Sequence, residues 1–204
     1  MQDKFQPSIT GHVLARDKET GEVLLDKKNA IHYGNMAFIV ANALTNSSDA
    51  FVHYMAFGNG ATSVDTSGKI TYKSPRVTDA YEQGANLYSR TYWKAISSNS
   101  ENTDVTNNFI QVIPGTSYTD LKMTCTLSYN EPGDQDVFDS STTNEGEYIF
   151  DEIALFSFPT DPALPTAEER INTSTMLTHV IFHPVQKSAN RIIEVIYTIR
   201  IQLS

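Results

Sequence analysis

Cysteine, basic residues and long apolar runs are all scarce in this chain of 204 residues. Cys125 is the only cysteine, so no internal disulfide and no cysteine-based zinc site can form. No apolar run approaches the roughly 18–20 residues that a membrane-spanning helix needs. The first ten residues lack the basic start and apolar centre of a signal peptide. We therefore expect a protein that is made in a reducing cytoplasm and has no membrane partner.

Acidic residues outnumber basic residues in this chain. Lys and Arg total 15 against 24 Asp and Glu, which gives a net charge of −9. Because proteins bind phosphate backbones largely through Lys and Arg, no nucleic-acid partner is expected. Charged residues make up only 19% of the chain, and its many Ser, Thr and Asn residues suit strands and turns. The hydrophobic 40% can fill one core, and no linker divides the chain, so residues 1–204 are predicted to form a single domain.

The common catalytic and phosphate-binding motifs are missing as well. Gly58-Asn59-Gly60 indicates a turn and fits no phosphate-binding loop, and the chain contains neither GxSxG nor HExxH. Only His179 and His183 are close in sequence, and on a strand that spacing places them roughly 13 Å apart. The other histidines, which are dispersed, are His12, His32 and His53. We predict no enzyme, and no catalytic, cofactor or metal site.

One pair of residues and one single residue could carry chemistry but favour a structural role. Asp151 and Glu152 could act as an acid and a base, yet the sequence FDEIALF indicates the end of a strand whose Ile153 and Leu155 point inward. Cys125 alternates with apolar neighbours, which is typical of a small buried hydrophobe rather than of a nucleophile.

Two further groups could bind ligands. The acidic residues of one polar loop could offer oxygen ligands to Ca²⁺, but their spacing does not match a calcium-binding loop, so a solvated loop is favoured. They are Asp134, Asp136, Asp139, Glu145 and Glu147. The aromatic residues Tyr88, Tyr92 and Trp93, near Arg90 and Lys94, could stack on sugars or bases, but packing in a core or an interface is the stronger interpretation.

Alternating apolar and polar residues indicate a chain that is mainly β. Residues 9–15 and 22–26 flank Gly21 and predict a hairpin. One helix is predicted after an N-cap at Asn29, with a buried stripe of Met36, Ile39, Val40, Ala43 and Leu44 packed on a sheet. Further strands are predicted at residues 51–58, 86–96, 119–130, 147–158 and 176–182.

The chain is predicted to end in a long strand, residues 193–203, which pairs with the preceding strand through a turn at 186–190. Three polar connections, 97–108, 131–146 and 159–173, are long enough to favour contacts with neighbouring molecules. Together these features predict an antiparallel β-sandwich, jelly-roll-like, with one helix packed on it and long polar loops.

The order of several short motifs resembles that of small virion structural proteins of tailed bacteriophages. The motifs are ETGEVLLDKKNAIHYGNMA, MAFGNG, LYSRTYWK, FDEIALF and the terminal THVIFHPVQKSANRIIEVIYTIRIQL. Each is weak alone, and their order carries the likeness, which covers most of the chain. The resemblance implies a subunit of the virion without catalytic residues, located in the tail, neck or baseplate or as a decoration of the capsid.

Two functions remain open. The first is a non-enzymatic structural subunit that binds copies of itself and other virion proteins through its loops and sheet edges. The second is a carbohydrate-binding module of a receptor-binding tail device, with the three aromatic residues as stacking platforms and the acidic loop as a calcium site. A glycoside hydrolase is disfavoured because nothing fixes the separation of two loop carboxylates.

Overall fold

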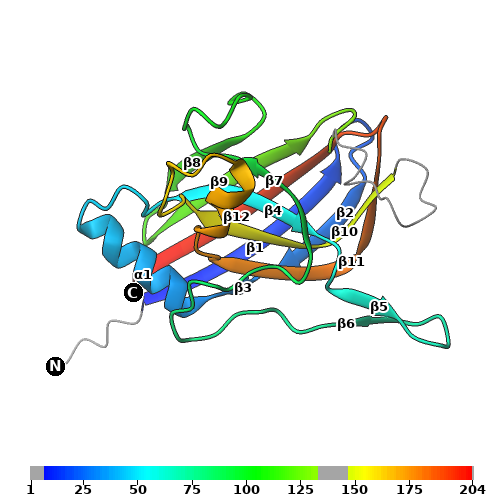
Figure 1. Ribbon diagram of the computed structural model, residues 1–204, viewed down its shortest axis with the longest axis horizontal. Coiled ribbons are helices and arrows are strands. Elements are labelled where there is room, and N and C mark those ends of the chain that lie inside the picture. The colour runs from blue at the N-terminus through cyan, green and yellow to red at the C-terminus, as the bar shows by residue number, and fades with distance from the viewer. Residues whose placement is uncertain (1–6, 133–146, 204) are drawn as a thin grey trace.

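The computed structural model describes residues 7–132 and 147–203, which form a mainly β structure of two large antiparallel sheets (Figure 1). The first sheet has the strand order β2-β1-β12-β9-β8. Its strands are β2 (Val23–Lys28), β1 (Pro7–Asp17), β12 (Ile193–Leu203), β9 (Tyr118–Leu127) and β8 (Phe109–Pro114). The second sheet has the order β3-β11-β10-β4-β7. Its strands are β3 (Ala30–Ile31), β11 (Thr178–Ser188), β10 (Glu147–Ser157), β4 (Val52–Gly58) and β7 (Arg90–Ala95).

The two sheets share one hydrophobic core, to which each contributes its inward-facing side chains. In β9, Met123, Cys125 and Leu127 are fully buried, as the alternation of that segment predicts. They pack in the same cluster as Phe57 of β4 and Phe150 of β10, which belong to the second sheet. A two-layer β structure with a common core is therefore the observed architecture.

Three of the eight strand pairings in the two large sheets join strands that follow one another in the chain. β1 pairs with β2, β8 with β9, and β10 with β11, each as antiparallel neighbours. The predicted first hairpin is confirmed, and Gly21 takes the positive φ of 75° that its turn requires. Jelly-roll connectivity is not confirmed, because a strict jelly roll alternates between sheets rather than keeping sequential strands paired in one.

The predicted hairpin between the last two strands is wrong. β11 lies in the second sheet, whereas β12 lies in the first sheet between β1 and β9. The turn before β12 therefore carries the chain from one layer to the other. Pairing on both sides satisfies the backbone groups along the eleven residues of β12, which explains its unusual length.

The predicted helix exists as α1 (Tyr33–Leu44), but it begins later than expected. Residues 30–31 pair with β11 instead, and the N-cap is His32, whose side chain accepts a hydrogen bond from the Asn35 N–H. Met36 and Ile39 join the core as predicted, whereas three other members of the expected buried stripe are exposed. These are Val40, Ala43 and Leu44. The sheets cover only one side of the helix.

The outer face of the second sheet is covered by two segments, 59–89 and 159–173. The strand predicted at residues 86–96 begins only at Arg90, so residues 86–89 belong to the first of these segments. Segment 59–89 contains the two-stranded hairpin of β5 (Thr62–Val64) and β6 (Ile70–Tyr72). A second helix, α3 (Ala167–Asn172), lies within the predicted loop 159–173 and begins with a capping box of Thr166 and Glu169. A second apolar cluster joins the sheet's outer face to these segments, with Leu87 and Ile171 among its buried members.

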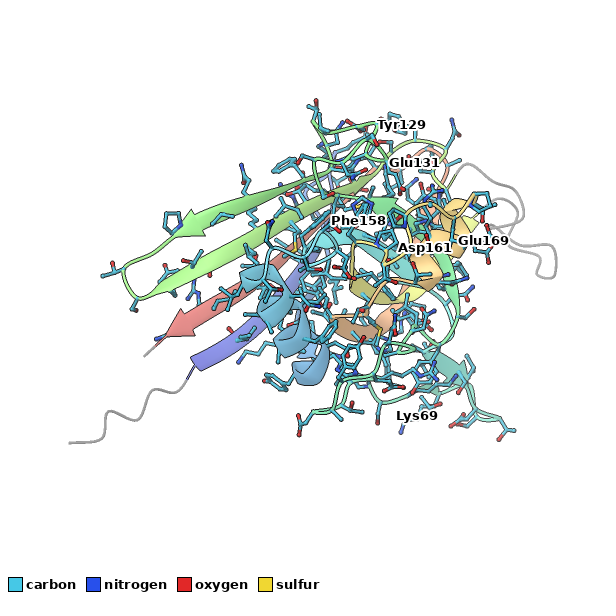
Figure 2. All side chains as sticks on the ribbon, turned by 60° about the vertical axis from the view of Figure 1, so that its left-hand side comes forward. Lys69, Tyr129, Glu131, Phe158, Asp161 and Glu169 are labelled. Carbon is cyan, nitrogen blue, oxygen red and sulfur yellow. The ribbon has the colours of Figure 1, made fainter. Side chains whose placement is uncertain are left out.

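One end of the first sheet extends past the second sheet. Figure 2 shows the β8–β9 hairpin and the adjoining ends of β12 and β1 projecting beyond α1. Strand β1 begins at this end of the sheet with Pro7, whose backbone is paired with that of Leu203 in β12. α1 lies beside the projecting part, so an apolar surface of the first sheet faces the helix rather than another sheet.

Candidate functional site

Asp151 and Glu152, the carboxylate pair that the sequence singles out, lie in the middle of β10 and not at a strand end as predicted. The prediction of a strand end is therefore wrong, although Ile153 and Leu155 do point into the core. Asp151 accepts hydrogen bonds from the backbone N–H groups of Ala61 (3.0 Å) and Thr62 (2.8 Å). The Asp151 carboxylate thereby fixes the start of segment 59–89, which covers the outer face of the second sheet.

Glu152 holds the other end of the same covering segment. Its carboxylate accepts hydrogen bonds from the backbone N–H of Tyr88 (3.0 Å) and of Ser89 (2.8 Å). The ring of His179 lies 2.9 Å away from Oε2, and neither side chain is exposed to solvent. Burial raises the pKa of Glu152, but the hydrogen bonds from His179, Ser89 and Tyr88 outweigh it and leave the pKa below its usual value.

The contacts of His179 define its tautomer. The backbone N–H of Arg76 donates to Nδ1 at 2.9 Å, so the ring hydrogen is on Nε2 and is donated to Glu152. His179 therefore links β11, β10 and segment 59–89 through its two nitrogens. An acid–base catalyst must reach its substrate, whereas this pair is enclosed and saturated with structural hydrogen bonds. We call Glu152 and His179 a joint, because their hydrogen bonds hold segment 59–89 on strands β10 and β11.

His183, the neighbour of His179 in the sequence, has a different environment. It is exposed on β11, and its Nδ1 lies 3.2 Å from the hydroxyl of Tyr72. Within residues 7–132 and 147–203, no group of three or more His, Cys, Asp or Glu side chains is placed to hold a metal ion. The acidic loop, predicted to be solvated and considered as a calcium site only as the alternative, lies outside the described residues apart from Glu147, whose backbone begins β10.

A hydroxyl, an imidazole and a carboxylate meet at a second buried joint, which the sequence does not reveal. Ser97 Oγ lies 2.7 Å from His53 Nδ1, and His53 Nε2 lies 3.4 Å from Glu101 Oε2. The antiparallel pairing of β4 with β7 brings these side chains together from distant parts of the chain. The same three groups activate serine nucleophiles in hydrolases.

The remaining contacts of Glu101 favour a structural role for this joint. The Tyr54 hydroxyl donates to Oε2 at 2.6 Å, and Arg170 Nε of α3 donates to Oε1 at 2.8 Å. Burial lowers the pKa of His53, which keeps the ring neutral near pH 7. Glu101 thus ties loop 97–108, β4 and α3 to one another, and Ser97 itself is only 7% exposed.

The three aromatic residues considered for sugar binding do not form one platform. Tyr92 and Trp93 line a polar hollow of about 390 Å³, together with Glu101, Glu131 and Arg170. Tyr88 is not part of this hollow. Its ring lies under the cations of two side chains of segment 59–89, those of Lys73 and Arg76.

The candidate basic neighbours of these aromatic residues are also engaged. Lys94 Nζ donates to both carboxylate oxygens of Glu131, at 3.0 and 2.8 Å, and to the carbonyl of Thr126. Arg90 donates to the Asn172 side chain at 2.6 Å and lies over the Trp93 ring. These contacts hold the edge strand β7 against neighbouring elements.

A larger and apolar cavity, of about 550 Å³, lies between α1 and the projecting end of the first sheet. Its walls include Ile39 and Val40 of α1, Leu121 of β9 and Ile201 of β12. None of the eighteen described residues that line it is charged. A cavity of this size and composition suits apolar groups, and few polar atoms are available to orient a substrate.

Comparisons of the chain with protein-family models, curated proteins and solved structures find no match. The helices among the described residues are too short or too polar to cross a membrane. Among the described residues, the buried acids and imidazoles hold separate segments together, and the accessible features include a sheet edge, a polar hollow and an apolar cavity.

Proposed function

We propose that the chain is a non-enzymatic structural subunit of a tailed-phage virion, made in the host cytoplasm and incorporated at the tail, neck or baseplate. A capsid decoration protein is the alternative position. The proposal rests on the motif order described above and on one structural observation, the edge of the first sheet at β8, which pairs with no second strand among the described residues. In this function, copies of the chain and other virion proteins are the partners.

β8 differs from the other six-residue edge strands of the described sheets. Its sequence FIQVIP carries no charge, whereas the β2 edge carries Asp26, Lys27 and Lys28, and the β7 edge carries Arg and Lys. Val112 of β8 is 66% exposed and Ile113 is 44% exposed. Natural sheets protect free edges with charges, so an uncharged, exposed and apolar edge favours pairing with a neighbouring strand.

The test is to locate the protein in purified particles with an antiserum and to measure the incorporation of edge variants. We expect Val112→Lys combined with Ile113→Lys to reduce incorporation, because charges on the edge oppose strand addition. Val23→Lys, on the β2 edge, is the matched control and should be incorporated normally. Absence of the wild-type chain from every particle would refute the proposal.

The polar hollow supports the second candidate function, carbohydrate binding by a receptor-binding tail device. The hollow combines Tyr92 and Trp93 with carboxylates and a guanidinium, which are groups that contact sugar rings and hydroxyls. A glycan array with wild-type protein and Trp93→Ala tests it, since binding that requires Trp93 supports this function. A melting temperature that falls on addition of a chelator would further support the calcium-dependent form of the module.

A further inference from the structure

A small hollow of about 270 Å³ lies where β2 and β11, which belong to different sheets, meet the β5–β6 hairpin. Figure 1 shows this hairpin next to β11. Three lysines line the hollow, Lys27 and Lys28 of β2 and Lys73 just after β6, and none of its described lining residues is Asp or Glu. In a chain with 24 acidic and 15 basic residues, this is an unusual concentration of positive charge. We call it the lysine hollow.

The charges of the three lysines are not neutralised by carboxylates. Within residues 7–132 and 147–203, the lysine ion pairs lie elsewhere. Lys27 Nζ donates to the carbonyl of Ile181 at 2.8 Å, and Lys73 Nζ donates to the carbonyl of Gly60 at 2.6 Å. A carbonyl is a neutral acceptor and takes up one of the three donors of an ammonium group. These bonds therefore hold two of the ammonium groups in place while their charges and further N–H donors are left for a ligand.

Two acidic residues adjoin the lysine hollow, and both are engaged. Asp26 lies 2.6 Å from the ring of His12. Glu152 is buried behind His179 and accepts backbone N–H groups of segment 59–89. More distant acids are screened, because the Debye length at physiological salt is about 8 Å. The hollow is therefore locally positive, although the chain as a whole carries a charge of −9.

We propose that the lysine hollow binds a phosphate group, either free phosphate or the phosphate of a small phosphorylated molecule. A carboxylate is matched best by the planar fork of arginine, whereas several lysines, as point charges, can surround a multiply charged anion. The described lining holds three lysines and no arginine, which favours phosphate. Tyr72 and Pro75 also line the hollow and offer an apolar wall to the carbon skeleton of a phosphorylated ligand. Such a site is independent of the proposed structural function.

The three lysines are exposed, so a ligand can reach them without any movement of the chain. The test is isothermal titration calorimetry of the full-length protein in a phosphate-free buffer at physiological salt. Inorganic phosphate and ribose 5-phosphate are the probes, and acetate is the carboxylate control. We expect saturable binding of phosphate with a dissociation constant of about 1 mM or lower.

Lys28→Gln should raise this dissociation constant about fivefold or more, because it removes one of the three charges. Among the described residues Lys28 has no side-chain hydrogen bond or ion pair, so the variant should fold normally, which circular dichroism can confirm. Lys69→Gln is the matched control. Lys69 is exposed in the turn of the β5–β6 hairpin, outside the hollow (Figure 2), and its replacement changes the net charge equally while leaving binding unchanged.

The two probes separate the sources of the phosphate group. Equal affinities would identify free phosphate as the ligand, and tighter binding of ribose 5-phosphate would identify a phosphorylated small molecule; both results support the site. Three results would overturn it. These are no saturable binding of either probe, binding of acetate as tight as that of phosphate, and equal weakening by Lys28→Gln and Lys69→Gln, which would show attraction by overall charge alone.

Discussion

Glu152 Oε2 and His179 Nε2 lie 2.9 Å apart on adjacent strands, with both side chains fully buried. The pair also receives backbone N–H groups from segment 59–89, at Arg76 and Ser89 among others. It therefore holds a long covering segment on the sheet, which a catalytic pair open to substrate would not do.

Replacing Glu152 should loosen this segment. We expect Glu152→Ala to lower the free energy of unfolding by about 3–5 kcal/mol, because it leaves buried donors without an acceptor. Urea unfolding measures the loss, and trypsin should cut faster at Lys69 and Lys73. Glu22→Ala removes an exposed ion pair with Arg191 and should cost less than about 1 kcal/mol. Equal effects of the two variants would contradict the proposed joint.

Stability should fall as the pH drops below about 6.5. Burial lowers the pKa of His32 and of His53 in the folded protein, whereas the unfolded chain takes up protons near the ordinary value of about 6.5. Each histidine can contribute at most about 1.4 kcal/mol of lost stability per pH unit. The loss begins near pH 6.5 and ends below the lowered pKa of each ring.

Polar side chains lie beside the rings of both His32 and His53. Glu82 and Thr78 lie near His32 Nε2, and Glu101 and Ser97 face His53. His32→Asn keeps a good N-cap for α1 and removes one titration. Urea midpoints measured between pH 8 and pH 5 should therefore vary less in this variant than in the wild type; identical pH profiles would contradict the assignment to His32.

Gly34→Ala should destabilise the protein, although alanine is the better helix former by about 1 kcal/mol. A Cβ at this position would lie 2.2 Å from the backbone carbonyl carbon of Ala80, so the helix or the covering segment must move. At Gly84, by contrast, no heavy atom lies within 4 Å of an added Cβ, and Gly84→Ala is the control. Thermal melting should separate the two, with a lower midpoint for Gly34→Ala alone.

Cys125 should not react with thiol reagents while the protein is folded. Burial raises the pKa of its thiol to about 12, and the side chain is completely enclosed in the core. At pH 8 a colorimetric disulfide reagent should modify the thiol only after guanidinium unfolds the chain. Rapid modification under native conditions would show that the first sheet opens locally at β9.

The strands and their buried faces could be predicted because alternation in the sequence has a direct structural consequence. Successive side chains of a strand point to opposite faces, so Met123, Cys125 and Leu127 had to share one side of a strand. The sequence analysis missed β8 and α3, although the largely apolar stretch 109–113, which only Gln111 interrupts, and the Thr166–Glu169 capping box were readable signals.

The candidate joints could not be predicted, because they join segments far apart in the chain. Nothing near Ser97 indicates His53, and nothing near His179 indicates Glu152; strand pairing alone brings each pair together. The predicted strand end at Asp151 was wrong for a related reason. A buried charged residue in mid-strand is tolerated only when distant donors satisfy it, as Ala61 and Thr62 do for Asp151.

By itself the sequence determined the mainly β composition, the inward side of most strands and the impossibility of an internal disulfide, since local periodicity and residue counts suffice for these. The tertiary structure decided that β12 leaves its predecessor for the other sheet and that one side of α1 stays uncovered. Those outcomes depend on which surfaces compete for the same partner, a property of the whole folded chain that no window of residues contains.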